Sequence, residues 1–74
     1  MSDTTNNLVT LAAILRSRRR ALLLTQEDVG DLCNVQRQTI GRLENADPTV
    51  SLGTAMTVAD VLGVDLSLST DDTR

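Results

Sequence analysis

Five polar side chains between positions 36 and 42 are of the types that read base pairs in double-stranded DNA. They are Gln36, Arg37, Gln38, Thr39 and Arg42. Arginine can donate two hydrogen bonds to O6 and N7 of guanine, and glutamine can bond N6 and N7 of adenine in the same two-pronged way. If these residues begin a helix that enters the major groove, Arg37 and Gln38 are the best candidates for reading bases. Gln36 and Thr39 would then reach a base or the backbone.

Arg42 follows Gln38 by four residues, so it would lie on the same face of such a helix, further along the groove. A phosphate or an outer base is its expected contact. The alternative interpretation for all five side chains is a solvated helix face that binds no ligand.

Two short helices joined by a tight turn would position these side chains. The first is expected at residues 26–33, because Thr25 before it and Asp28 three residues later can cap its exposed amides reciprocally. The second, which would be the recognition helix, is expected at residues 36–45. Apolar residues at helical spacing turn both helices toward a shared core: Val29, Cys33, Val35, Ile40 and Leu43.

The turn between the two helices contains Asn34, which tolerates the left-handed conformation better than any residue except glycine. Gly30 lies inside the first helix, where glycine costs about 1 kcal/mol relative to alanine. We therefore expect Gly30 to allow a close approach of the second helix.

These features resemble the helix-turn-helix of the phage repressor and Cro class, also called the XRE class. In that class a small residue stands in the place of Gly30, a turn residue in that of Asn34, and apolar residues at the core positions above. The resemblance runs from about Leu11 to Leu68 and implies an all-α, repressor-like DNA-binding domain. From Glu44 onward the chain is most similar to HipB-type antitoxins, which repress their own operon and bind a HipA-type kinase toxin.

Contacts with the DNA backbone are expected at both ends of the motif. Thr25 and Gln26 occupy the start of the first helix, where free amides and the positive end of the helix dipole favour a phosphate. The resemblance also implies that Gln26 braces the recognition helix and that Asn45 touches the next phosphate. Arg19 and Glu44 match positions that pair in some phage repressors, which would tie an earlier helix to the end of the recognition helix.

The charge of the chain is unevenly distributed. A net charge of −3 over 74 residues argues at first against a nucleic-acid partner. However, six of the seven arginines lie between Arg16 and Arg42, where only three acids oppose them, and aspartates accumulate in the second half. Without aromatic residues the chain cannot stack on unpaired bases, so double-stranded DNA is the expected partner. For Arg16, Arg18 and Arg20 two interpretations stay open, phosphate contact and simple solubilisation.

No enzymatic chemistry is expected, because the chain has no histidine, no lysine and no glycine-rich phosphate loop. The single Cys33 cannot form an internal disulfide or complete a zinc finger, and its spacing from Val29 favours a buried role. We expect no metal and no cofactor. No signal peptide or membrane-spanning apolar stretch is visible, so the expected location is the cytoplasm, in association with the nucleoid.

One domain is expected at residues 8–69, between a disordered N-terminal arm (1–7) and a disordered tail (70–74). Its first helix, at residues 8–22, would turn five apolar residues to one side: Leu8, Leu11, Ile14, Leu15 and Leu22. Members of the class usually have glycine where Leu23 stands, in a left-handed helix cap. Leu23 departs from that pattern.

A fourth helix is expected after a break at residues 45–48, where Pro48 disfavours helix in the residue before it. Ser51 would cap this helix and Gly63 would end it. Its apolar positions recur at helical spacing: Leu52, Ala55, Met56, Ala59 and Leu62.

After Gly63 the apolar period changes from helical to alternating, with Val64, Leu66 and Leu68 on one side. A lone strand leaves its backbone groups unpaired, so we expect these three residues to form an antiparallel ribbon with the same strand of a second copy. The alternative is a fifth helical turn or a frayed tail. The expected fold is therefore all-α, with four to five helices and a short C-terminal strand that pairs across a homodimer.

The leading hypothesis is a sequence-specific transcriptional regulator, a repressor or autorepressor, that binds a palindromic operator as a homodimer. Within it, the chain would also be the antitoxin of a HipA-type kinase toxin, with the acidic second half as the docking face. The alternatives are a stand-alone phage or host repressor without a toxin, and a helix-turn-helix module that acts only in protein interaction.

Overall fold

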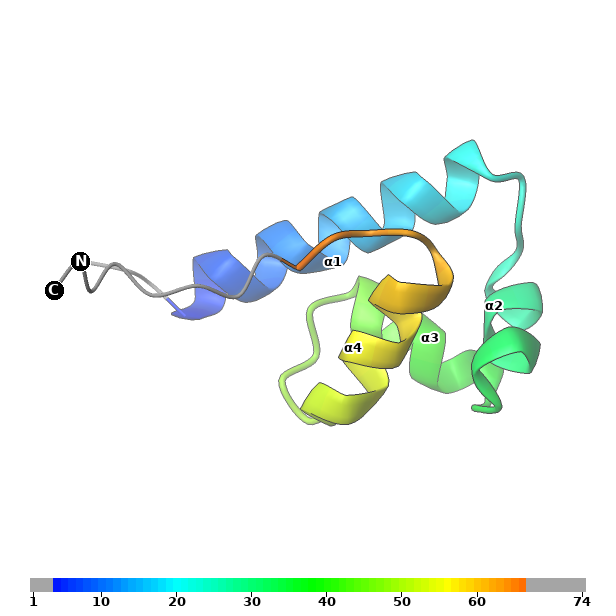
Figure 1. Ribbon diagram of the computed structural model, residues 1–74. Coiled ribbons are helices and arrows are strands. Elements are labelled where there is room, and N and C mark those ends of the chain that lie inside the picture. Colours follow the sequence, from blue (N-terminus) through cyan, green and yellow to red (C-terminus); the bar gives the residue numbers. More distant parts are fainter. Residues whose placement is uncertain (1–3, 67–74) are drawn as a thin grey trace, which may run out of the picture.

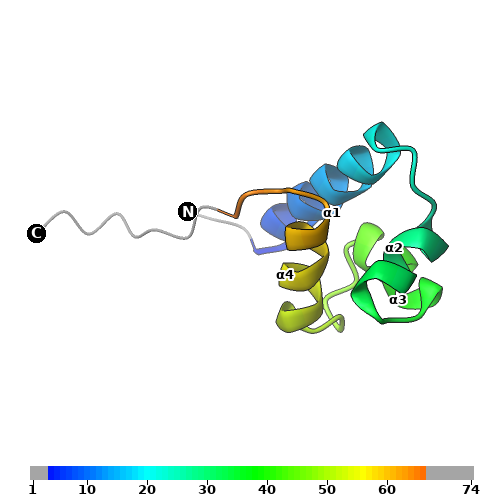
Figure 2. The same ribbon diagram turned by 45° about the vertical axis from the view of Figure 1, so that its right-hand side comes forward.

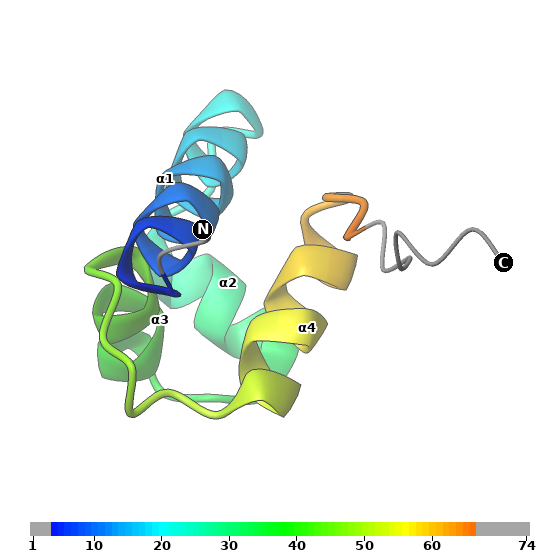
Figure 3. The same ribbon diagram turned by 90° about the vertical axis from the view of Figure 1, so that its left-hand side faces the viewer.

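The computed structural model describes residues 4–66, which form four helices (Figure 1). They are α1 (Thr4–Ala21), α2 (Gln26–Cys33), α3 (Arg37–Glu44) and α4 (Leu52–Val61). The long helix α1 lies across one side of the three shorter ones, and turning the molecule shows α2 and α3 crossing at a short turn (Figure 2). Seen from the α1 side, α3 and α4 flank α2 (Figure 3), and both contact it, while α3 also contacts α1.

A single apolar core lies among the four helices. Its buried members come from all four helices and the end of α4: Leu15, Val29, Ile40, Leu43, Ala55, Val58, Ala59 and Leu62. The expected core of the helix-turn-helix is confirmed, with Val29, Ile40 and Leu43 buried and with Cys33 and Val35 partly buried against them.

The expected apolar sides of α1 and α4 were partly wrong. Leu11 and Leu15 lie against the core as expected, but Ile14 and Leu22 are exposed, and Ala12, which was not expected there, is buried. On α4, Leu52 and Met56 are exposed and Val58 is buried. The reason is that each helix has more apolar residues than one face can hold, so helical spacing alone does not decide which of them are buried.

The first helix begins at Thr4, so residues 4–7, which we had assigned to a disordered arm, are helical. Threonine and asparagine are poor helix formers, yet each residue added to an existing helix gains a backbone hydrogen bond without repeating the cost of nucleation. Burial of Ala12 and Leu15 anchors α1, and the helix extends toward its N-terminus from there. Residues 1–3 lie outside the described part.

All four helices end in the same way, with one residue in the left-handed conformation that is bonded back onto the last turn. These residues are Leu23 (φ 61°), Asn34 (φ 58°), Ala46 (φ 59°) and Gly63 (φ 71°). After α1, for example, the amide of Leu24 donates to the carbonyl of Arg19 at 3.1 Å and that of Leu23 to Arg20 at 3.0 Å. This is the Schellman motif, which satisfies carbonyls that the helix end leaves free.

Replacing Leu23 by glycine is expected to stabilise the protein by about 1 kcal/mol. Leucine pays a steric penalty in the left-handed conformation that glycine does not, and the Leu23 side chain is 90% exposed, so little contact is lost. Thermal unfolding should show the rise in midpoint. Leu32→Gly is the matched control, because Leu32 is also exposed but lies inside α2, where glycine should destabilise. A fall in stability with both variants would contradict the assigned strain.

Residues 64–66 follow α4 without forming helix or strand, so no strand is present in the described part of the chain. Val64 and Leu66 are half-buried against the core of their own chain, and the amide of Val64 donates to the carbonyl of Ala59 at 2.8 Å. Leu68 lies outside the described residues. The intermolecular ribbon expected at residues 64–69 therefore stays a prediction.

Candidate nucleic-acid interface

The start of α2 is fixed by a complete capping box. The amide of Asp28 donates to the Thr25 hydroxyl at 3.0 Å, and the amide of Thr25 donates to the Asp28 carboxylate at 2.8 Å. The reciprocal capping expected for Thr25 and Asp28 is confirmed. The amides of Gln26 and Glu27 bond no other described residue and remain available to a ligand.

The turn between α2 and α3 holds the two helices at a fixed crossing. Asn34 adopts the expected left-handed conformation, and the amide of Val35 donates to the carbonyl of Gly30 at 2.8 Å. A Cβ atom on Gly30 would lie only 2.8 Å from the carbonyl oxygen of Val35 and 3.4 Å from the amide nitrogen of Arg37. The close approach expected at Gly30 is confirmed, and it seats the first residue of α3 directly on α2.

The N-terminal end of α3 presents polar side chains outward. Gln36, Arg37 and Gln38 are exposed, whereas Thr39 is half-buried. Gln36 is the N-cap residue, but its side chain makes no capping hydrogen bond. Arg37 lines a surface hollow together with Thr25 and Gln26, so the start of α3 and the start of α2 border one surface. The side chain of Arg37 makes no hydrogen bond or ion pair with any other described residue, which leaves its guanidinium free to bind a ligand.

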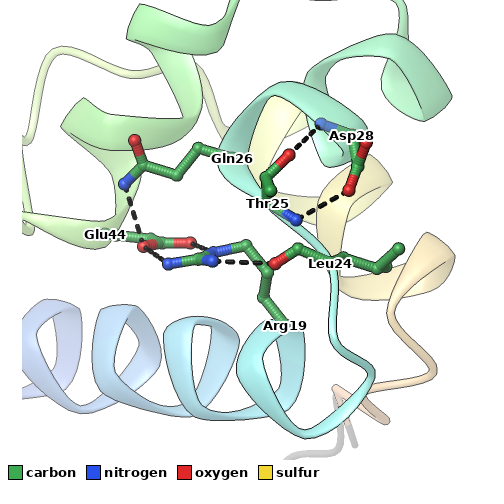
Figure 4. A network of polar contacts seen from close by, with 6 residues as sticks. All are labelled: Arg19, Leu24, Thr25, Gln26, Asp28 and Glu44. Carbon is green, nitrogen blue, oxygen red and sulfur yellow. Dashed lines mark hydrogen bonds and ion pairs between the residues drawn. The ribbon is translucent and has the colours of Figure 1, made fainter.

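A largely shielded, partly buried ion pair ties the far end of α3 to α1 (Figure 4). Arg19 donates from Nε to Glu44 at 2.6 Å and from Nη2 at 3.0 Å, and its Nη1 donates to the carbonyl of Leu24 at 2.9 Å. Gln26 reaches the same carboxylate with its amide nitrogen at 3.2 Å. The two charged side chains are only 11% and 5% exposed, so helices α1, α2 and α3 meet in one network beneath the candidate interface.

The charges of this network shift its pKa values. The hydrogen bond to Glu44 raises the pKa of Arg19 further above its ordinary value. Burial raises the pKa of Glu44, but the hydrogen bonds from Arg19 and Gln26 and the charge of Arg19 outweigh it, so the pKa falls below its usual 4.5. Hydrogen bonds with Thr25 likewise lower the pKa of Asp28.

We expect the stability to decline below about pH 4.5, the ordinary pKa of glutamate. A carboxyl group whose folded pKa is lowered stabilises the protein fully above its unfolded pKa and loses that contribution as the pH falls through the folded value. Glu44→Gln should lower the unfolding free energy by about 1–2 kcal/mol at pH 7 and flatten its decline in acid. Urea unfolding at several pH values measures both. An unchanged acid slope in the variant would contradict the role of Glu44.

Two further contacts were not expected from the sequence. Arg42 donates from Nε to Asp47 at 3.0 Å and from Nη2 to the hydroxyl of Thr49, so it is engaged with the loop after α3. Arg18 donates from Nε to the carbonyl of Leu62 at 2.8 Å, which caps the end of α4 from α1. In the sequence, the only indication of the Arg42 contact was an acid five residues later. No residue near Leu62 indicated its contact with Arg18.

These contacts change how the arginine-rich window is interpreted. Glu44 and Asp47 lie just beyond that window, yet each neutralises one of its arginines. Arg37 is therefore a freer cation than Arg42 or Arg19. Asn45 is exposed and is the C-cap residue of α3, at the start of the loop that contains Asp47.

In the described part of the chain, no helix is long and apolar enough to cross a membrane, and no cluster of acids and cysteine could hold a metal ion. A family model described as helix-turn-helix matches residues 15–68, which is more than half of the chain. No curated protein and no solved structure matches this chain significantly.

Proposed function

Because the chain belongs to the XRE-type helix-turn-helix family of DNA-binding transcription regulators, we propose that it represses transcription by binding a palindromic operator as a homodimer. In this proposal α3 is the recognition helix. Arg37 and Gln38 read base edges, and Gln36 and Thr39 contact a base or the backbone. Thr25, Gln26 and Asn45 contact phosphates, and Arg42 contacts a phosphate or an outer base.

One observation carries this proposal: the exposed, unpaired Arg37 on a helix end whose position is fixed from below. Gly30 and Asn34 set α3 on α2, and the Arg19–Glu44 ion pair holds its other end. A base-reading side chain must be held to within about 0.5 Å of its productive geometry, and helices achieve this better than loops.

Dimerisation is proposed to occur through residues 64–69. The alternation of Val64, Leu66 and Leu68 supports a ribbon with a second copy, which would place two α3 helices about 34–36 Å apart, one turn of DNA. Sedimentation at several concentrations tests this. We expect twice the chain mass, and a monomer at all concentrations would refute this part of the proposal.

The DNA-binding proposal is tested with a duplex from the region upstream of the coding sequence. Its affinity is compared with that of a shuffled duplex of the same composition, at two salt concentrations. We expect the upstream duplex to bind more tightly, and both affinities to fall with salt because cations are released from the phosphates. Equal affinities for the two duplexes would refute sequence-specific binding, and no binding at low salt would favour a module that acts only in protein interaction.

A second candidate is the antitoxin role, with a HipA-type kinase toxin as partner. It is favoured by the similarity of residues 44–69 to HipB-type antitoxins and by aspartates such as Asp60 and Asp65 after the DNA-binding half. Co-purification with the product of the adjacent gene tests it. An adjacent gene unrelated to any kinase would favour a stand-alone repressor instead.

A further inference from the structure

Arg42 belongs to the proposed interface, but its positive charge is already paired with an acid of its own chain. Its Nε donates to the Asp47 carboxylate at 3.0 Å, and its Nη2 donates to the Thr49 hydroxyl. The side chain is 51% exposed, on the helix face that also carries Gln38, so DNA that reaches Gln38 would also approach Arg42.

The carboxylate of Asp47 is held firmly and stays charged. Its Oδ1 accepts from the amide of Thr49 at 2.8 Å and from the Thr49 hydroxyl at 2.7 Å. These two bonds, followed by that of Arg42, lower the pKa of Asp47 to about 2. Its negative charge is therefore present at every pH at which the protein would meet DNA.

A paired arginine contributes less to DNA binding than a free one. Binding gains free energy when a cationic side chain replaces the cations condensed on a phosphate. If Arg42 must first give up Asp47, or share its charge with it, this gain is partly offset. The negative carboxylate also approaches the phosphates together with Arg42 and repels them.

We propose that Asp47 competes with DNA phosphate for Arg42, so that it weakens binding to all DNA sequences alike and reduces the salt dependence of binding. This inference rests on the proposed DNA-binding function and on the placement of α3 in the groove. In this inference the loop after α3 limits the affinity for DNA without changing how the base-reading side chains bind.

The test is Asp47→Asn, because asparagine keeps an oxygen for the Thr49 amide but loses both the negative charge and the oxygen that accepts from Arg42. The matched control is Asp60→Asn, which changes the net charge equally on an exposed position of α4. Both are titrated against the upstream duplex and a random-sequence duplex over a range of salt. Asp47→Asn should bind both duplexes about two- to fivefold more tightly, the range of an exposed ion pair. Its salt slope should steepen by up to about 0.9 per subunit.

The mechanism is checked with the same change in an Arg42→Gln background, where Asp47→Asn should keep only the small gain from removing its repulsion of the phosphates and should lose the gain that comes from freeing Arg42. Asp47→Ser, which also offers an oxygen to the Thr49 amide, must reproduce the gain. Equal affinities for Asp47→Asn and Asp60→Asn would overturn the inference, and so would weaker binding by Asp47→Asn, which would make Asp47 a support for Arg42. In both cases the proposed function would stand as long as the unmodified protein binds DNA, whereas its failure to bind either duplex would refute both proposals.

Discussion

Arg37→Ala should weaken binding to the operator by about 1–3 kcal/mol per half-site, a loss of roughly 5- to 150-fold. The discrimination against other bases at one position of each half-site should disappear with it. The guanidinium has no partner among the other described residues, so its removal leaves the fold intact and only the DNA contact is lost. Titrations against operators altered one base pair at a time measure the effect, and an unchanged unfolding midpoint shows that the domain is still folded.

Two variants separate base reading from other effects. Arg20→Ala removes the same charge from an exposed position of α1, outside the recognition helix, so it reports the loss of one positive charge without the loss of a base contact. Asn45→Ala should weaken binding to all sequences alike, as expected for a phosphate contact. If Arg37→Ala bound every operator variant as the unmodified protein does, base reading by Arg37 would be disproved.

The parts of the fold that could be predicted are those in which a few neighbouring residues decide the outcome. Thr25 and Asp28 are three residues apart and satisfy each other's amides, so the start of α2 was correct to the residue. Asn34 is one of the few residue types that accept a left-handed turn. Gly30 indicated a close approach because a glycine inside a helix needs a compensating contact.

Other features depend on the packing of distant segments, which local patterns do not encode. Leu23 and Ala46 adopt the left-handed conformation although neither residue favours it, because the chain must turn sharply there for the next element to reach the core. The bond from Arg18 to Leu62 joins residues 44 positions apart.

The same distinction between local and distant interactions holds for the candidate interface. The outward side chains of α3 could be chosen from residue type and helical spacing, because a helix fixes which positions share a face. The pairing of Arg42 with Asp47 could not, because the loop residue reaches back only once Ala46 has reversed the chain direction. Counting charges along the sequence therefore overstated how many arginines are free.

Gly30→Val is expected to lower the unfolding free energy by about 3 kcal/mol, the upper range for a group forced into a filled site. A Cβ at this position would meet the carbonyl oxygen of Val35 at 2.8 Å, and this is a backbone atom that cannot rotate away. Val35 cannot retreat either without breaking the bond from its amide to Gly30. A domain of this size has a total stability of about 4–11 kcal/mol, so the unfolding midpoint should fall by more than about 10 °C.

Gly53→Val is the matched control, because a Cβ on Gly53 meets nothing within 4 Å. Its unfolding free energy should stay within about 0.5 kcal/mol of the unmodified protein, since valine is no worse than glycine inside a helix. Urea unfolding of the three proteins side by side gives the comparison, and equal losses for the two valine variants would refute the tight crossing. Because any relief at Gly30 must push α3 away from α2, the fraction of Gly30→Val that stays folded should also bind the operator more weakly. Gly53→Val should bind the operator normally. A loss of DNA binding seen only with Gly30→Val would then be caused by the displacement of α3 and not by the added side chain.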